Sequence, residues 1–258
     1  MFMDKKYWVP ALERANDILH LLAAEPSRLR LMDLANRLKI NKSSMFSLLH
    51  TLETLGWVVK EKGGTYALGP TLGALSASYF RQFHILQAFY AEAGASVRRV
   101  NETVQLSVLN GRDIMYLAKE ECSGPLRVAT DPGMKLPAYA TAMGKVQLSR
   151  LDYAELKALY PEYRLEPRTP HTVRDVDQLW AQLAQIRASG YGSDEQEAMT
   201  GFFCVAAPVF NHDGQIIAAV SFTMLENSWM EKADAARDEI IDLGRRLSVR
   251  AGHVFSPG

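Results

Sequence analysis

The segment INKSSMFSLLHTLETLGW, residues 40–57, contains a short helix with two unlike faces. At about 100° per residue, one stripe is apolar and consists of Met45, Leu48, Leu49 and Leu52. The opposite stripe carries small hydroxyls and one histidine in place of salt-bridging charges: Ser43, Ser47, His50 and Thr54. The apolar stripe indicates packing against other helices. The narrow polar face suits insertion into a DNA major groove, where side chains approach base edges closely.

The flanking segments complete a recognisable order of elements. PALERANDILHLLAAE, from Pro10, predicts a first helix with Leu12, Ala15, Leu19 and Leu22 on one face. MDLANRLK predicts a second short helix. After the third helix, WVVKEKGGTYAL indicates two strands joined at Gly63-Gly64. Three helices followed by a hairpin are the order of a winged helix-turn-helix.

The distribution of charge agrees with a DNA-binding N-terminal part. Residues 1–70 hold ten Lys and Arg against seven Asp and Glu, whereas the remainder holds 19 against 22. Basic residues gather near the second helix, the third helix and the hairpin. The residues predicted to contact DNA are Lys42, Ser43, Ser44, Phe46, Ser47, His50, Lys60 and Lys62. Two other interpretations stay open, a solvated face of a three-helix core and a module that binds protein.

Residues 71–100 predict a connecting helix with an unusual number of aromatic side chains. We expect Tyr79, Phe80 and Phe83 to be buried between subunits, because a monomer that exposed them would carry a large apolar patch. Gly94 marks a place where this helix could break.

The C-terminal part of the chain has a different sequence pattern. TVQLSVLNGRDIMYLAKE and CVAAPVFNHDGQIIAAVSFTM predict hairpins around Asn110-Gly111 and Asp213-Gly214. Helical patterns lie between and after them, in AMGKVQLSRL, YAELKALY, VDQLWAQLAQIRASG and EKADAARDEIIDLGRRLSV. This mixture predicts an α+β domain with a mainly antiparallel sheet.

Composition narrows the function classes. The 258 residues are 48% hydrophobic and 22% charged, with zero formal net charge. Two cysteines and a start without an apolar core predict a reducing cytoplasm. Apolar runs are of strand length, so no membrane role is expected. The six histidines have no metal-ligand spacing, and the chain lacks P-loop and G-x-S-x-G motifs, so neither a metal nor an enzyme is expected.

Five segments together resemble a known family. VPALERANDILHLLA, LMDLANRLKINKSSMFSLLHTLETLGWV and YALGPTLGAL are similar to the N-terminal domain of IclR-type bacterial transcription regulators. LRVATDPGMKLPAYATAMGK and SGYGSDEQEAMTGFFCVAAPVFNHDGQIIAAVSF resemble that family's effector-binding domain. The resemblance implies a winged helix-turn-helix at 1–70, a linker helix at 71–100 and a GAF-like effector-binding domain at 101–258. It also implies dimers, or dimers of dimers, on double-stranded operator DNA.

This chain departs from the family pattern at two places in its first domain. The family often has a basic residue where Ser47 stands and a hydroxyl where Met32 stands at the start of the second helix. An Arg would add a strong base or phosphate contact, and a methionine cannot cap a helix.

The effector site is predicted around LPAYATAMGK, where an extended segment leads into a helix. Ala142 and Met143 lie at the helix start, whose free N–H groups attract a carboxylate. The resemblance places Asp194, Cys204, Ser221 and Thr223 around the same pocket, with an apolar wall of Val128, Leu136, Met143 and Phe202. We therefore expect a small organic acid as effector and no cofactor.

Each polar member of this set also has a plain structural interpretation. Asp194 could cap a turn after Gly192, Cys204 could be a small buried hydrophobe, and Ser221 could bond only to backbone. The predicted function is a ligand-responsive, DNA-binding transcriptional regulator. One alternative is a ligand-sensing module that binds a protein without binding DNA. The other is a cysteine-dependent enzyme using Cys204, for which His212 lies at the far end of the strand.

Overall fold

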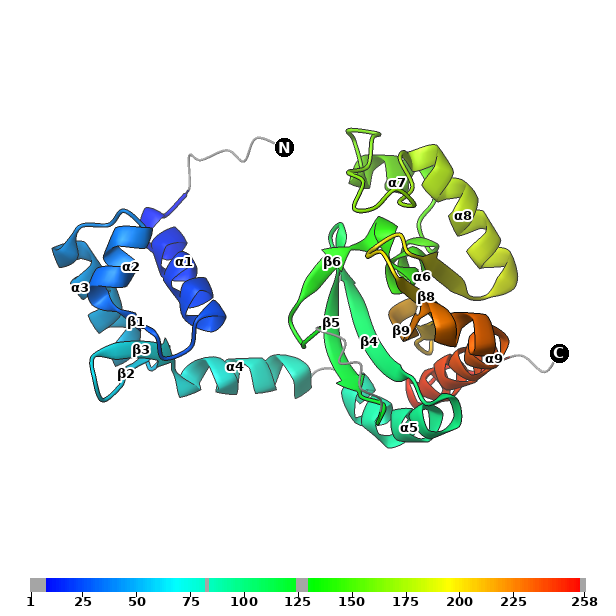
Figure 1. Ribbon diagram of the computed structural model, residues 1–258, viewed down its shortest axis with the longest axis horizontal. Coiled ribbons are helices and arrows are strands. Elements are labelled where there is room, and N and C mark those ends of the chain that lie inside the picture. Colours follow the sequence, from blue (N-terminus) through cyan, green and yellow to red (C-terminus); the bar gives the residue numbers. More distant parts are fainter. Residues whose placement is uncertain (1–7, 82–83, 124–129, 256–258) are drawn as a thin grey trace. The chain divides into compact units, whose positions relative to one another are not determined.

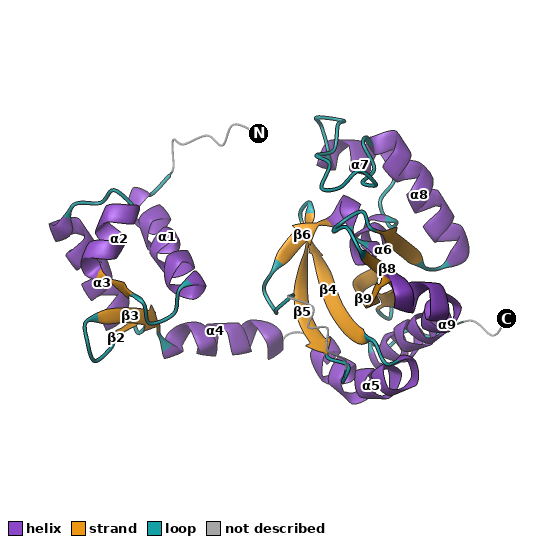
Figure 2. Cartoon of the chain, viewed as in Figure 1, coloured by secondary structure: helices purple, strands orange, loops and turns teal. Residues whose placement is uncertain are grey.

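The computed structural model describes residues 8–81, 84–123 and 130–255 of the chain. The chain divides into two compact units, one ending at residue 83 and one beginning at residue 84 (Figure 1). The first unit is mostly helical, and the second surrounds a sheet with helices (Figure 2). Each unit has a core of its own, so each is described separately.

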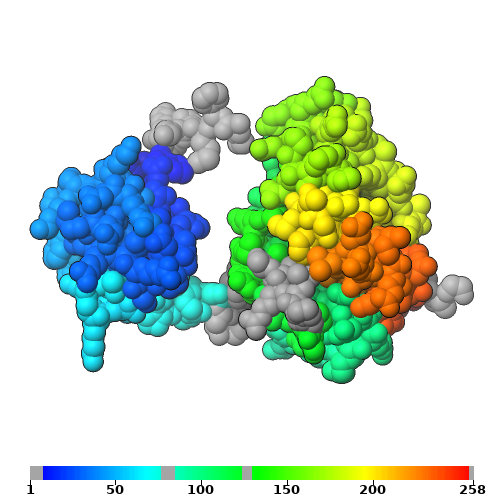
Figure 3. Space-filling view, viewed as in Figure 1, coloured from blue at the N-terminus to red at the C-terminus, as the bar shows by residue number. Residues whose placement is uncertain are grey.

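The N-terminal unit has the predicted winged helix-turn-helix order. Its helices are α1 (Pro10–Ala24), α2 (Leu31–Arg37) and α3 (Lys42–Thr54). Its strands are β1 (Leu29–Arg30), β2 (Val58–Lys60) and β3 (Thr65–Leu68), in the antiparallel order β1-β3-β2. The β2–β3 hairpin is the wing, which projects from the surface of its unit as a narrow light-blue ridge (Figure 3).

The core of this unit is formed by one stripe from each helix. Met45, Leu49 and Leu52 of α3 are buried as predicted, and Leu48 is half-buried. The expected core face of α1 is partly wrong. Leu12 is 65% exposed, whereas Ala15 and Leu22 are buried as expected and Leu19 is half-buried against the core. Ile18, which was not expected in the core, is fully buried. Which side chains of α1 are buried depends on the elements that pack against this helix, so the sequence of α1 alone did not determine its buried face.

Two helices connect the wing to the sheet of the second unit. They are α4 (Pro70–Arg81) and α5 (His84–Val100). Gly94 lies inside α5, so the predicted break at that glycine is wrong. Of the expected interface residues, Phe83 lies outside the described residues, and the structure describes only the backbone of Tyr79 and Phe80, within α4.

The second unit contains one six-stranded antiparallel sheet in the order β6-β5-β4-β9-β8-β7. The strands are β4 (Thr103–Asn110), β5 (Asp113–Glu120), β6 (Lys135–Pro137), β7 (Gly192–Glu195), β8 (Phe202–Phe210) and β9 (Ile216–Leu225). Both predicted hairpins are present, as β4–β5 and β8–β9. The short edge strand β6 overlaps the extended segment expected before the helix at Ala142, whereas the short edge strand β7 was not predicted.

Helices cover both faces of this sheet. The long helix α9 (Glu226–Arg250) packs on β8 and β9 and against α5. On the other face lies α6 (Ala142–Leu148), preceded by the 3-10 turn η2 (Ala138–Ala140) and backed by α8 (Val176–Ser189). A further helix, α7 (Tyr153–Leu159), packs against α8 (Figure 1). The space between the sheet and α6 is where the predicted effector residues meet.

Candidate functional site

The first candidate site is the outer face of α3. Asn41 caps this helix, because its side-chain Oδ1 accepts the Ser44 backbone N–H at 2.8 Å and the Ser43 hydroxyl at 2.8 Å. The preceding helix α2 begins at Leu31, and the Asp33 carboxylate accepts the Arg30 backbone N–H at 2.8 Å. Met32 is therefore not the cap of α2, and its side chain is 48% exposed.

The residues predicted to contact DNA form one exposed surface on α3. Lys42, Ser43, Phe46, Ser47 and His50 are exposed, and Ser44 is half-buried. The rings of Phe46 and His50 are parallel, with centroids 6.1 Å apart. The Ser47 hydroxyl donates its proton to the Ser43 carbonyl at 3.1 Å. Towards DNA or another bound partner, this hydroxyl can therefore act only as a hydrogen-bond acceptor. On the wing, Lys60 and Lys62 are exposed. These two residues offer positive charge beside the helix.

The second candidate site is a cavity of about 200 Å³ between the sheet and α6. Its described lining is mostly apolar and contains no Lys, Arg or His. The lining residues are Gln105, Tyr116, Thr130, Met134, Leu136, Thr141, Ala142, Met143, Asp194, Ala198, Met199, Phe202, Cys204, Ser221 and Thr223.

Strand register brings the polar residues of this cavity together. Asp194 of β7 is directly opposite Cys204 of β8, and Cys204 is directly opposite Thr223 of β9. Directly opposed residues share a face of an antiparallel sheet, as do residues two apart on one strand. Ser221 therefore joins the same row, and so does its partner Gln105 on β4.

These side chains are linked by hydrogen bonds. The Thr223 hydroxyl donates to Gln105 Oε1 at 2.8 Å and lies 3.4 Å from Cys204 Sγ. The Gln105 amide donates in turn to the Thr130 hydroxyl. Burial raises the pKa of the Cys204 thiol to about 12, which disfavours the thiolate that a nucleophile needs. His212 is exposed and lies 3.2 Å from Asp213, so the structure brings no support for a Cys204–His212 pair.

Asp194 is the ionisable carboxyl group of the cavity. Its Oδ1 accepts the backbone N–H groups of Glu197 at 2.6 Å and of Ala198 at 3.3 Å. The side chain is buried, and burial raises its pKa to about 7 despite the nearby Lys145 ammonium. The turn-capping interpretation and the cavity-lining interpretation of Asp194 therefore both hold.

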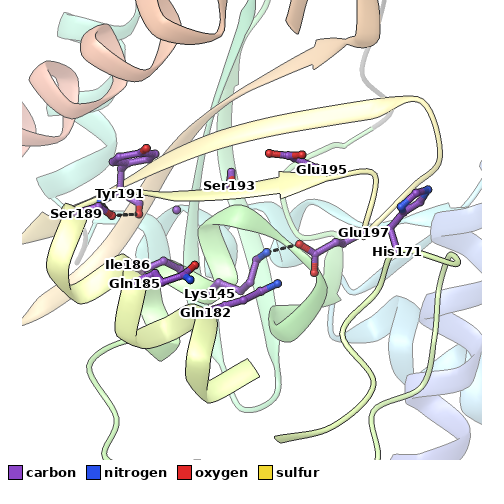
Figure 4. Close-up of a pocket in the computed structure, with 11 residues that line it drawn as sticks. Lys145, His171, Gln182, Gln185, Ile186, Ser189, Tyr191, Ser193, Glu195 and Glu197 are labelled. Carbon is purple, nitrogen blue, oxygen red and sulfur yellow. Dashed lines mark hydrogen bonds and ion pairs between the residues drawn. The ribbon is translucent and has the colours of Figure 1, made fainter. Parts of the chain in front are cut away.

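A buried ion pair lies behind Asp194. Lys145 Nζ of α6 is 2.5 Å from Glu197 Oε1, and both side chains are almost fully buried. The pair lines a polar cleft of about 440 Å³ between α6, α8 and β7, and Figure 4 shows its two side chains joined among the other lining residues. His171 and Glu195 also line this cleft. The pair is separated by 52 residues in sequence, so no local pattern could predict it.

Most of the predicted ligand residues are brought to one place. Leu136, Ala142, Met143, Asp194, Phe202, Cys204, Ser221 and Thr223 all line the cavity. Val128 lies outside the described residues. Seven further lining residues were not predicted as ligand contacts: Gln105, Tyr116, Thr130, Met134, Thr141, Ala198 and Met199. The signal for Gln105 was a single amide inside the apolar strand TVQLSVL.

Neither a membrane-spanning helix nor a metal-binding cluster is present among the residues that the structure describes. None of their helices is long and apolar enough to cross a membrane. In the same part of the chain, no group of three or more His, Cys, Asp and Glu side chains could hold a metal ion.

Comparison with known proteins shows which family has this architecture. Residues 11–62 match the model of the IclR helix-turn-helix domain, and residues 77–249 match that of the bacterial transcriptional regulator IclR C-terminal domain. The HTH-type transcriptional regulator XynR of Escherichia coli is 33% identical over 248 residues, covering 95% of this chain and 98% of XynR.

Solved structures show the same fold. The Thermotoga maritima IclR superposes with a TM-score of 0.81 at 27% identity, over 95% of this chain and 99% of that one. An IclR homologue from Microbacterium hydrocarbonoxydans, complexed with 4-hydroxybenzoate, superposes with a TM-score of 0.80 at 18% identity, over 94% of this chain and 99% of its own. Family models, relatives and fold agree over both units, and the chain belongs to the IclR family of bacterial transcriptional regulators.

Proposed function

We propose that this regulator acts in the cytoplasm and senses a small organic acid in the cavity between the sheet and α6. The observation that carries the proposal is the row of Asp194, Cys204 and Thr223 on three adjacent strands, facing an otherwise apolar cavity. Such a cavity suits a ligand with one polar end and a small apolar remainder. The cavity volume favours an acid larger than two carbons.

The proposed pose puts the effector carboxylate at the start of α6. The Thr141 hydroxyl accepts the Gly144 N–H at 3.2 Å, and no described residue accepts the N–H groups of Ala142 and Met143. Those two N–H groups and the hydroxyls of Ser221 and Thr223 would bind the carboxylate. The second polar atom of the effector would then face Asp194.

The proposed DNA contact uses α3 in the major groove and the wing along the phosphate backbone. Lys42, Lys60 and Lys62 would contact phosphates, whereas His50 and its neighbours on α3 would reach base edges. The regulator would bind its operator as a dimer or a dimer of dimers, whose two-fold symmetry sets the spacing of the half-sites.

Regulation follows from the position of the ligand. An effector that touches both α6 and the sheet can bind one arrangement of the protein more tightly than another, and only such a difference shifts the population that binds DNA.

Thermal-shift screening against small organic acids tests the effector class, and retardation of DNA from the regulator's own promoter region tests the DNA contact. We expect a stabilising acid to change the retardation. DNA retardation without any stabilising acid would contradict acid sensing, and ligand binding without retardation would favour the protein-interaction alternative.

A further inference from the structure

The cavity presents an imbalance of charge to any acid that enters it. Asp194 lines it, and no cationic side chain does among the described lining residues. A carboxylate effector would place a second negative charge beside Asp194. At a separation of roughly 6 Å and an effective dielectric constant of about 20, that repulsion weakens binding about a hundredfold. A proton on Asp194 removes the repulsion.

The geometry of Asp194 suits a neutral acid. Its Oδ1 is already held by the N–H groups of Glu197 and Ala198. Among the described residues, both donors to the Asp194 side chain bind Oδ1, so Oδ2 can carry a proton and donate it to a ligand oxygen. The side chain is 2% exposed, and burial favours the uncharged form.

The groups around Asp194 act on its charge in opposite directions. Lys145 of α6 favours the ionised carboxylate, and Glu197, which follows β7, favours the protonated form. Cys204 of β8 and Tyr116 of β5 face the same carboxyl group. On the far side of the Lys145–Glu197 pair, His171 and Glu195 line the polar cleft (Figure 4).

The ion pair also fixes the position of Asp194. The Glu197 carbonyl accepts the Thr172 hydroxyl at 2.7 Å, while the Glu197 side chain is held by Lys145. The Glu197 N–H that binds Asp194 is therefore anchored on both sides.

We propose that this regulator binds its acid effector together with one proton, which Asp194 holds and donates to an effector oxygen, while the Lys145–Glu197 pair positions Asp194. The inference rests on the proposed acid effector. The proton comes from solvent, and no covalent bond other than O–H is made or broken.

The test is calorimetry on the full chain with acetate, pyruvate, 2-oxobutanoate, benzoate and 4-hydroxybenzoate, each in two buffers that hold the chosen pH. The two buffers differ in ionisation enthalpy, so their difference in binding heat counts protons. For an acid that binds, we expect uptake of nearly one proton at pH 8 and nearly none at pH 5.5. The affinity should be level below about pH 6.5 and fall about tenfold per pH unit above about pH 7.5.

Variants of Asp194 show whether its carboxyl group is protonated or ionised when the ligand binds. Asp194→Asn keeps the acceptor for the two N–H groups and stays neutral, so it should bind without proton uptake and equally well at pH 6 and pH 8.5. Asp194→Ala should bind at least tenfold more weakly at both. If Asp194→Asn is as weak as Asp194→Ala at pH 6, Asp194 acts as an ionised acceptor and the inference fails.

Variants of the ion pair should shift the pH at which the affinity declines, whereas a purely structural role of the pair would leave that pH unchanged. Glu197→Gln should shift the decline in affinity to lower pH, and Lys145→Met should shift it to higher pH. The double variant removes both charges and should restore the wild-type profile, which also guards against a single variant that does not fold. An unshifted profile in Glu197→Gln, or a folded double variant whose decline in affinity lies at a different pH from that of the wild type, would overturn the role of the pair.

Two outcomes separate this inference from the proposed function. An acid that binds at pH 8 without proton uptake overturns proton coupling and leaves acid sensing intact. If no acid in the panel binds at pH 6, where Asp194 is largely protonated, both the acid effector and its proton are overturned.

Discussion

At the scale of single residues, Asp194 ties the stability of the protein to pH. Its pKa is about 7 in the folded chain against an ordinary value of 3.8. Between about pH 4 and pH 7 the folded chain keeps a proton that the unfolded chain releases, so this residue's contribution to stability falls as pH rises. Above pH 7 the loss is complete.

Asp194→Asn should therefore stabilise the unliganded protein at pH 8. We expect a gain of about 1–3 kcal/mol, because the buried charge is gone and the acceptor for Glu197 and Ala198 remains. At pH 4 the two proteins should unfold alike. Denaturant unfolding at both pH values checks this, and an equal difference at both would contradict the raised pKa.

A second residue-scale prediction concerns α3. Lys42→Ala should weaken binding to all DNA sequences and reduce the salt slope by about one, because one phosphate contact no longer releases a counterion. His50→Ala should instead change sequence preference, by about 1–3 kcal/mol at one base pair. Retardation at several salt concentrations measures both, with the exposed Lys157→Ala of α7 as control. Wild-type behaviour in both variants would show that the assignment of α3 to the groove is wrong.

At the scale of elements, two glycines in helices have opposite roles. A Cβ on Gly144 of α6 would lie 2.2 Å from the Ala138 carbonyl oxygen of η2, whereas one on Gly94 of α5 meets nothing closer than the end of Arg98 at 3.4 Å. Gly144→Ala should push α6 from η2 and abolish acid binding, while Gly94→Ala should stabilise the protein by about 0.5–1 kcal/mol. Thermal melts with and without a stabilising acid compare them. Unchanged acid binding in Gly144→Ala would mean that the start of α6 does not position the effector.

The elements also show what the sequence could predict. Asn110-Gly111 and Asp213-Gly214 identified two hairpins, because their turn chemistry is local. The strand β7 was missed, because GSDE has no alternating pattern and is a strand only by pairing with β8. Leu12 was misplaced for a related reason, since the buried phase of α1 depends on the helices it meets.

The residues of the candidate effector site also divide into those that the sequence could predict and those that it could not. Residues of one strand or one helix start, such as Ser221, Thr223 and Ala142, were found from periodicity and from the family resemblance. Lys145 and Glu197 were not, because a buried ion pair between distant segments exists only once the chain is folded. The two residues meet only through tertiary packing, so no regular spacing in the sequence indicates the pair.

At the scale of the whole molecule, sensing and DNA binding should separate cleanly. Thr223→Val and Asp194→Ala should abolish the response to acid and leave operator binding without acid intact, because these residues lie in the second unit, apart from α3. Retardation with and without a stabilising acid checks this, with the exposed Asp213→Ala as control. Unchanged calorimetric affinity in both variants would place the effector elsewhere.

Assembly is the other prediction at this scale. We expect at least a dimer in light scattering at micromolar concentration, since an operator with two half-sites needs two copies of α3. A strictly monomeric protein that still bound its operator would contradict the symmetric arrangement.

The start of the second unit at His84 has a practical consequence. The packing of α5 against α9 and against β4 and β5 makes it an integral layer of the sensor rather than a free tether. A fragment cut just before this helix would keep the sheet, both covering layers and every described residue of the acid cavity. We therefore expect such a fragment to fold by itself and, fused behind a foreign output domain, to serve as a genetically encoded reporter of the effector.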